Sequence, residues 1–275
     1  MPIIGTEVKT AKRWLDIFFL PRFQPIEFLK PFIIILLATI LSSKKNFHVH
    51  YKYFLSFVAI LPVSFLLMIQ PDIGQTLLIF LSWLTLVFIS GISLVIFFSF
   101  FGGLFLVLLY LIFTVSRFEY IRSRIHSFFN PTTGTHTGQS EKAIDAITSG
   151  GFFGKGIGEG TLKNRVPEAH TDYIVSVISE EFGVTTIILL LIIFLFFIYN
   201  VFKKIYSEKD EKIKLILVGS ITLILTQALI HLGVNISLFP TTGMTLPYLS
   251  YGGSSIIGVS ILSGIILNLT KRKIN

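Results

Sequence analysis

The chain has 275 residues, of which 52% are hydrophobic and 28 are phenylalanine, and its mean hydropathy is +0.78. This composition excludes an ordinary soluble protein and indicates a chain whose main solvent is a lipid bilayer. The absence of cysteine excludes disulfides, iron–sulfur clusters and cysteine nucleophiles. The net charge of +8 is explained first by the role of lysine and arginine in orienting membrane spans, rather than by binding of nucleic acid.

Seven apolar stretches are candidates for membrane helices, because a helix needs about 20 mostly apolar residues to cross the hydrocarbon, and somewhat fewer at a thin spot. The stretches are too continuously apolar for barrel strands, and a helix satisfies its own backbone polar groups in lipid. The sequence therefore predicts an all-α, polytopic integral membrane protein with about seven transmembrane helices. They cover about residues 28–42, 53–69, 75–90, 92–115, 183–202, 213–232 and 253–269.

The basic residues between these spans indicate the orientation. Three clusters fall on one side if the spans alternate, and the positive-inside tendency makes that side the cytoplasm. The clusters are Lys44, Lys45 and Lys52; Lys203, Lys204, Lys209, Lys212 and Lys214; and Lys271, Arg272 and Lys273. The C-terminus is then cytoplasmic and the long loop at residues 116–172 is extracytoplasmic. Met1 would lie outside without a signal peptide, so we expect one or three preceding spans to be missing from this chain.

Charged residues mark the first span and the link after the second. Glu27 and Lys30 are three residues apart and share a helical face, and ionisable groups at a membrane are usually paired and often functional. We therefore expect an ion pair at the mouth of the first span. In "QPDIGQT", Asp72 follows Pro71, and the pattern leaves open a turn role or a chemical one.

The long loop opens with "RFEYIRSRIHSFFNP", which places Arg122 and Arg124 near the end of the fourth span. Arginines in this position either anchor lipid headgroups or clamp a phosphate through their forked donors. Glycines then follow in "SGGFFGKGIGEGT", whose spacing fits neither a P-loop nor a dinucleotide fingerprint. Two alternatives remain for this segment: a flexible surface loop, or a backbone-lined cradle for a headgroup with Lys155, Lys163 and Arg165 nearby.

The loop ends in "PEAHTDYIVSVISEEFG", where Glu168 and Asp172 are four residues apart. We expect both on one helical face that continues to Glu180. Such paired carboxylates divide acid–base work, bind a divalent cation, or cap a helix, for which Thr171 and Asp172 are suitable types. His170 with Asp172 makes a poor zinc site, whereas magnesium remains open.

The last two spans are joined by a charge-free stretch, "PTTGMTLPYLSYGGSS". Non-helical backbone of this kind at a membrane lines a cavity or packs on protein. The sixth span carries Gln227 and His231, which keep a transport function open, although a core histidine with its hydrogen bonds satisfied is the simpler interpretation of His231.

Taken in order, these segments resemble the SEDS family of shape, elongation, division and sporulation proteins. The resemblance covers the whole chain and is closer to the division (FtsW) branch than to the elongation (RodA) branch. One departure is Ile26, where the family pattern usually has serine. The segments that carry the resemblance are "AKRWLD" (11–16), "FQPIEFLK" (23–30), "QPDIGQT" (70–76), "GGFFGKGIGEGT" (150–161), "PEAHTDYI" (167–174), "EEFG" (180–183) and "PTTGMTLPYLSYGGSS" (240–255).

The resemblance implies one membrane domain over residues 1–275, the counterpart of the last seven spans of a ten-span fold, with residues 116–172 as a catalytic extracytoplasmic loop. It implies a peptidoglycan glycosyltransferase that polymerises lipid II at the outer face of the bacterial cytoplasmic membrane during cell division, at the septum. It also implies a divalent cation, magnesium or manganese, and no organic cofactor. The implied partners are a class B penicillin-binding protein, other division proteins and membrane lipid, and no nucleic acid.

Asp172 occupies the position of the family's essential aspartate, which implies the role of general base for the attacking sugar hydroxyl, with Glu168 assisting. The residues expected to bind substrate or its pyrophosphate are Arg122, Arg124, Lys155, Lys163, Arg165, His170 and Thr171. Two other functions stay open at this point, a lipid II flippase and a non-catalytic division scaffold.

Overall fold

The computed structural model describes residues 5–8, 11–17, 20–43, 49–115, 118–129 and 137–271. The chain forms two compact units. The first contains Met1–Ser90, Ile193–Ala228 and Met244–Asn275, and the second contains Gly91–Ile192 and Leu229–Gly243. Of the basic clusters used above for orientation, Lys44, Lys45, Arg272 and Lys273 lie outside the described residues.

Seven helices occupy the seven apolar stretches, so the predicted helices are confirmed in position. Five of them are long and apolar enough to cross a membrane: α2, whose apolar part is Tyr51–Ile69, and α4, α8, α9 and α10. Helix α3 is apolar but shorter, and the number of spans stays a prediction. The seven helices are α1 (Pro25–Leu41), α2 (Val49–Ile69), α3 (Ile73–Ile89), α4 (Leu94–Thr114), α8 (Val184–Ser207), α9 (Glu211–Asn235) and α10 (Gly253–Thr270).

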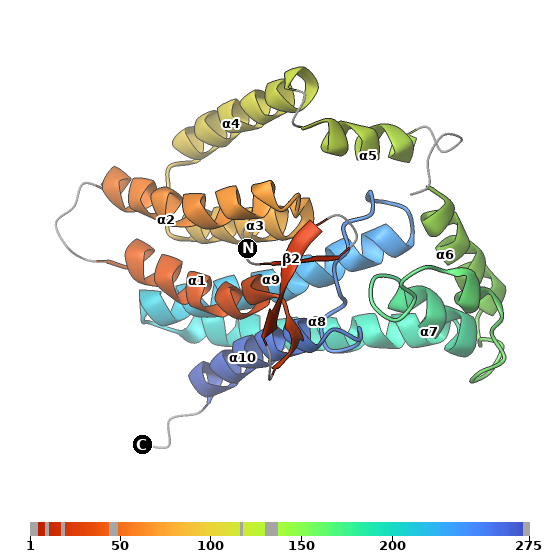
Figure 1. The fold of residues 1–275 in the computed structure, drawn as a ribbon. Coiled ribbons are helices and arrows are strands. Elements are labelled where there is room, and N and C mark those ends of the chain that lie inside the picture. The colour runs from red at the N-terminus through yellow and green to blue at the C-terminus, as the bar shows by residue number, and fades with distance from the viewer. Residues whose placement is uncertain are drawn as a thin grey trace. The chain divides into compact units, whose positions relative to one another are not determined.

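In the first unit, α1 lies beside α10, and α2 lies beside α3 (Figure 1). Proline at the first position of α1 suits a helix start, since its fixed φ is already helical and its missing N–H has no partner there. Ile34, Leu37 and Ala38 form the fully buried face of α1. Gly219 of α9 allows close packing, because a Cβ there would lie 2.7 Å from the Ile34 side chain.

A short antiparallel sheet precedes α1, which the sequence analysis did not predict. Its strands are β1 (Thr6–Val8), β2 (Ala11–Ile17) and β3 (Leu20–Phe23), in the order β1–β2–β3. Trp14 pairs with Thr6, and Leu15 pairs with Phe23. Arg13 on β2 donates to the carbonyl oxygens of Gln70 (3.2 Å) and Pro71, so the sheet is tied to the link between α2 and α3.

In the second unit, the long loop contains its own helices. They are α5 (Glu119–Phe129), α6 (Thr137–Gly150), the short 3-10 helix η3 (Leu162–Arg165) and α7 (Ile174–Phe182). Helices α6 and α7 lie side by side (Figure 1), with Ala143 and Ala146 of α6 and Val175 of α7 buried. This packing gives the segment before the span α8 a hydrophobic core of its own.

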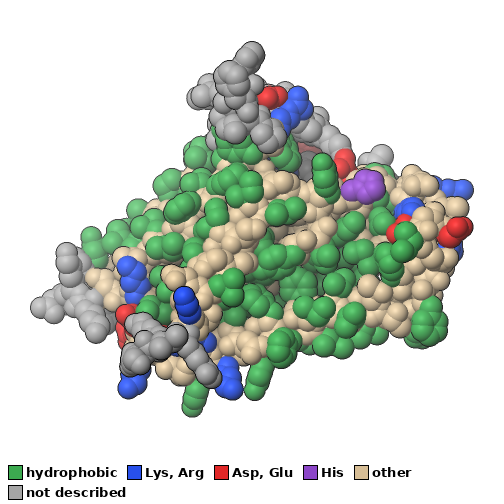
Figure 2. All heavy atoms as spheres, turned by 90° about the horizontal axis from the view of Figure 1, so that it is seen from below, with side chains coloured by type: hydrophobic (Ala, Val, Ile, Leu, Met, Phe, Trp, Pro, Cys, Tyr) green, Lys and Arg blue, Asp and Glu red, His purple; other side chains and the backbone are tan. Residues whose placement is uncertain are grey.

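The surface of α8 is almost entirely apolar and exposed. Its exposed residues include Ile188, Leu189, Ile192, Leu195 and Phe196. Figure 2 shows hydrophobic side chains over much of the face that it draws, in keeping with a multi-pass membrane protein. Such a surface is stable in lipid, because the acyl chains around it are as apolar as its own side chains.

Candidate functional site

Asp172 lies in a tight turn rather than on a helix. Glu168 has a positive φ of 55°, and its carbonyl oxygen accepts the N–H groups of Thr171 (3.1 Å), Asp172 (3.0 Å) and Tyr173 (3.3 Å). A residue in the left-handed region interrupts a right-handed helix. The prediction that Glu168 and Asp172 share a helical face is therefore wrong. The conformation of the turn determines where the two carboxylates lie.

The structure also excludes the capping role considered for Thr171 and Asp172. Helix α7 begins at Ile174, with Tyr173 as the N-cap and no side-chain cap bond. The Thr171 hydroxyl instead lies 3.2 Å from Oε2 of Glu168. Capping therefore gives no reason for an aspartate at position 172.

The main chain of Asp172 is held by a buried asparagine from α9. Nδ2 of Asn235 donates to the Asp172 carbonyl oxygen (3.1 Å) and to that of His231 (2.9 Å), and Asn235 is fully buried. Gly243 lies beside the carboxylate, since a Cβ there would be 3.6 Å from Oδ2 of Asp172. Asp172 is partly exposed, so its carboxylate is accessible while its main chain is held in place by the bond from Asn235.

The sequence analysis missed Asn235. An asparagine at the end of an apolar run has low hydropathy and no motif, so the only available signal was a polar residue four positions after His231. This spacing places both on one helical face. His231 is also buried, as expected for a core histidine.

The glycine-rich loop and the start of η3 bind two carboxylates of the same chain. Glu180 of α7 is fully buried, and its carboxylate accepts the backbone N–H groups of Leu162 (3.0 Å) and Lys163 (2.6 Å). Lys155 adds an ion pair at 3.5 Å. Glu181 accepts the N–H of Gly158 (3.2 Å) and pairs with the Lys163 ammonium. Lys155, Lys163 and the Gly158 N–H, which belong to the cradle alternative, are therefore already in contact with acids of this chain.

These contacts set the charge state of both acids. Burial by itself raises the pKa of Glu180, but the N–H groups of Leu162 and Lys163 and the nearby Lys155 outweigh it, so its pKa lies below the usual value. The bond from Lys163 is the largest cause that lowers the pKa of Glu181. Both carboxylates are therefore ionised at neutral pH.

We expect Glu180→Gln to destabilise the loop by about 1–3 kcal/mol, because a buried set of donors loses its charged acceptor. The pKa of Glu180 is lowered by folding, so its stabilisation is full above the unfolded pKa and decreases as pH falls through the folded one. Proteolysis of the 150–165 segment, followed from pH 7 to pH 3, should show this acid dependence in the parent and less of it in Glu180→Gln. The matched control is the exposed Glu159→Gln on the same loop, and an equal effect of both would contradict the role of Glu180.

The predicted cations have different surroundings. Lys155 and Lys163 are already paired with acids, whereas Arg165 is exposed at the end of η3. Arg122 is partly buried on α5, and its Nε has no hydrogen-bond partner among the described residues. The side chain of Arg124 lies outside the described part of the chain. His170 is exposed next to Thr171.

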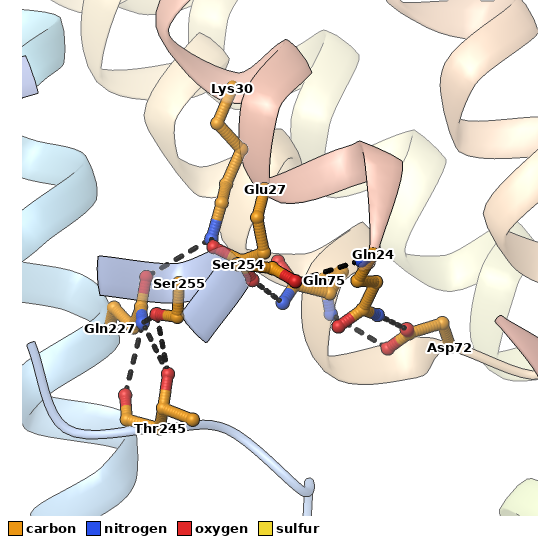
Figure 3. A network of polar contacts seen from close by, with 9 residues as sticks. All are labelled: Gln24, Glu27, Lys30, Asp72, Gln75, Gln227, Thr245, Ser254 and Ser255. Carbon is orange, nitrogen blue, oxygen red and sulfur yellow. Dashed lines mark hydrogen bonds and ion pairs between the residues drawn. The ribbon is translucent and has the colours of Figure 1, made fainter. Parts of the chain in front are cut away.

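A second polar cluster lies in the first unit and contains the predicted ion pair (Figure 3). Nζ of Lys30 lies 2.6 Å from Oε2 of Glu27, and both side chains are buried, which confirms the pairing. Gln75 donates to the other oxygen of Glu27 (2.6 Å), and Lys30 donates to Oε1 of Gln227 (3.1 Å). Every partner of this pair shown in Figure 3 is itself a buried polar side chain.

The cluster extends at both ends. Gln227 donates to the carbonyl oxygen of Thr245 (3.0 Å) and to Oγ of Ser255 (3.3 Å), which holds the charge-free loop before α10. At the other end Asp72 caps α3 by accepting the N–H of Gln75, and Gln24 donates to its second oxygen (3.2 Å). Burial raises the pKa of Asp72, against the lowering effect of Arg13. Asp72 therefore has the structural role in the link before α3 that was one of its two alternatives. Gln227 is a hydrogen-bonding member of the same cluster.

The described residues contain no group of three or more His, Cys, Asp or Glu side chains placed to hold a metal ion. A zinc site needs such a group. Magnesium keeps several waters and is commonly held by one or two carboxylates together with substrate phosphates. A partly exposed carboxylate such as Asp172 fits the second arrangement.

Comparisons with known proteins match nearly the whole chain. The model of the FtsW/RodA/SpoVE cell cycle protein family matches residues 1–275. A probable peptidoglycan glycosyltransferase FtsW of Caulobacter vibrioides is 35% identical over 99% of this chain and 69% of its own length. The corresponding protein of Nitrosomonas europaea is 35% identical over 98% of this chain and 70% of its own length.

Two solved structures have the same fold. A chain of a peptidoglycan synthase complex that coordinates polymerisation and crosslinking superposes with a TM-score of 0.79 at 26% identity, covering 98% of this chain and 76% of that one. The rod shape determining protein RodA of Thermus thermophilus superposes with a TM-score of 0.66 at 27% identity, covering 98% and 71%. The likeness therefore extends over nearly all of the chain in both sequence and structure.

Proposed function

This chain belongs to the FtsW/RodA/SpoVE family of cell cycle proteins and is a peptidoglycan glycosyltransferase, and we propose that Asp172 is the general base of its reaction. The observation that carries the proposal is the partly exposed carboxylate of Asp172 on a backbone held by buried Asn235. A general base acts only when it is both accessible and fixed in position.

The proposed substrate is lipid II. The 4-hydroxyl of its glucosamine attacks the anomeric carbon of the growing chain's muramic residue with inversion, and the bond to undecaprenyl pyrophosphate breaks. A sugar hydroxyl is a weak nucleophile at neutral pH, so Asp172 removes its proton as the new bond forms. The Glu168 side chain, which lies within 3.2 Å of the Thr171 hydroxyl, is proposed to orient this part of the substrate.

The leaving pyrophosphate gains negative charge and needs cations. Lys155 and Lys163 form ion pairs with Glu180 and Glu181, so we assign them mainly a structural role in the loop. Exposed Arg165 is then the cation of this loop best placed to bind the pyrophosphate, with the cations of α5 as further candidates. A bound magnesium or manganese ion would supply further neutralisation of this charge.

The protein is a multi-pass membrane protein. We further propose that it works at the division septum with its C-terminus in the cytoplasm, beside other division proteins. The structural neighbour belongs to a complex that both polymerises and crosslinks. This supports a crosslinking partner, and we propose a class B penicillin-binding protein in that role.

The proposal is tested by incubating the purified protein with labelled lipid II and Mg²⁺ or Mn²⁺ in detergent, with and without the crosslinking partner. We expect glycan polymer of increasing length. In vesicles, transbilayer movement of labelled lipid II without any polymer would contradict the proposal and support a transporter. Neither polymer nor movement, in a protein that still supports septation, would support a scaffold.

A further inference from the structure

Three large apolar side chains project from the glycine-rich loop. Phe152 is 73% exposed, Phe153 is 85% exposed and Ile157 is 78% exposed. We call these three residues the apolar tip. Nothing in the glycosyltransferase mechanism uses them, and contiguous apolar side chains on a protein surface usually mark a site of interaction.

The backbone of the apolar tip is attached to the start of span α8. The Val184 N–H donates to the Gly151 carbonyl oxygen (3.0 Å), and the Thr185 N–H and hydroxyl donate to that of Phe152 (3.3 and 2.9 Å). Gly183 lies so close that a Cβ there would be 2.1 Å from the Phe152 oxygen. A side chain at position 183 would separate the two segments, so this glycine is what allows the attachment.

The same segment is attached to α7. The Lys155 and Gly156 N–H groups donate to the carbonyl oxygens of Glu180 (2.9 Å) and Glu181 (3.0 Å). A Cβ at Gly154 would lie 2.2 Å from the Glu181 oxygen. The loop is therefore an ordered part of the α7–α8 junction, and the apolar tip is displayed from a fixed backbone.

This attachment determines the depth of the apolar tip. Helix α8 is apolar and long enough to cross a membrane, so its first turn lies at the boundary between the headgroups and the hydrocarbon. Phe152 is bonded to that turn. Exposed Ile188 and Leu189 lie in the next turn of α8. The apolar tip is thus attached one turn before the exposed apolar residues of the span.

We propose that the apolar tip inserts into the bilayer surface on the side where α8 begins, between the headgroups and the ends of the acyl chains. Phenylalanine and isoleucine gain by burial at this depth, while exposed Lys155 and Glu159 of the same loop stay at the polar level. Membrane insertion would hold the loop, and through it α7, at the level of a lipid-linked headgroup.

The chain has no cysteine, so a single cysteine gives a unique labelling site. Phe153→Cys is labelled with a nitroxide and reconstituted in vesicles of phosphatidylethanolamine and phosphatidylglycerol. Collision rates with oxygen, which concentrates in lipid, and with a water-soluble nickel chelate then report the depth. We expect label 153 to collide at least severalfold more with oxygen, relative to nickel, than a label at exposed Glu159→Cys. A label at Leu189→Cys should lie deeper than both.

Ile157→Cys repeats the measurement on the other side of the loop and should agree with position 153. Three results would overturn the proposal. Equal nickel access at positions 153 and 159 would place the apolar tip in water, and low access to both reagents would show it covered by protein. If protection appears only when the crosslinking partner is added, the surface binds that protein instead. The readout needs no activity, so it is independent of the proposed reaction.

Discussion

Replacing Asp172 by asparagine should lower the rate of glycan polymerisation about 10²- to 10⁴-fold, the usual contribution of a general base. Asparagine keeps the shape of the side chain but cannot take a proton at neutral pH. The main-chain bond from Asn235 to the Asp172 carbonyl oxygen does not involve the replaced atoms, so the turn should be kept. The measurement is the initial rate of polymer formation from labelled lipid II at saturating Mg²⁺ or Mn²⁺.

The matched control is Asp145→Asn on α6, an exposed aspartate in the same unit, which should retain the parent's rate. Both variants should unfold at the parent's temperature. An Asp172→Asn protein that is folded and polymerises at more than about a tenth of the parent's rate would rule out this aspartate as the base. The base would then have to be sought elsewhere, with Glu168→Gln as the next variant.

Replacing Lys30 by methionine should destabilise the protein by about 3–5 kcal/mol, because it leaves the buried Glu27 carboxylate without its cation. Gln227 would at the same time lose the donor at its Oε1. The expected result is a clear decrease in the unfolding temperature in detergent, since the same glutamine also holds the loop at Thr245.

A double variant, Glu27→Gln with Lys30→Met, separates the effect of the unpaired Glu27 charge from the effect of the lost hydrogen bond to Gln227. It removes both charges, so it should recover much of the stability lost in the single variant. Lys212→Met at the exposed start of α9 controls for loss of a lysine. If Lys30→Met unfolds at the same temperature as Lys212→Met, the ion pair does not stabilise the fold.

The helical part of the fold was predictable because it depends on local composition. A continuous apolar run of about 20 residues has few alternatives in a bilayer, so the seven helices appeared where the hydropathy indicated. The ion pair of Glu27 and Lys30 was predictable for a similar reason, since the two residues are three positions apart on one helix. The three short strands before α1 were missed because their segment has no clear alternating pattern.

The candidate site was only partly predictable. Asp172 and the glycine-rich loop could be selected from residue types and from family resemblance, but their geometry could not. The expected helical face failed because Glu168 takes a left-handed conformation, which residue type alone does not indicate. The contacts of Glu180 with the N–H groups of Leu162 and Lys163 were not predicted, because they join positions 18 and 17 residues apart in the sequence.

The sequence by itself indicated that this protein lies in a membrane, where its helices begin and end, and which family it resembles; the choice of Asp172 as the base came from that resemblance and stays a prediction. All of these depend on short segments or on their order along the chain. Only the tertiary structure decided that Asn235 holds Asp172, that Gln227 joins Lys30 to Thr245, and that Glu180 accepts the N–H of Lys163 at the start of η3. Hydrogen bonds between distant segments depend on backbone paths that bring donor and acceptor within about 3 Å, and no local pattern encodes that distance.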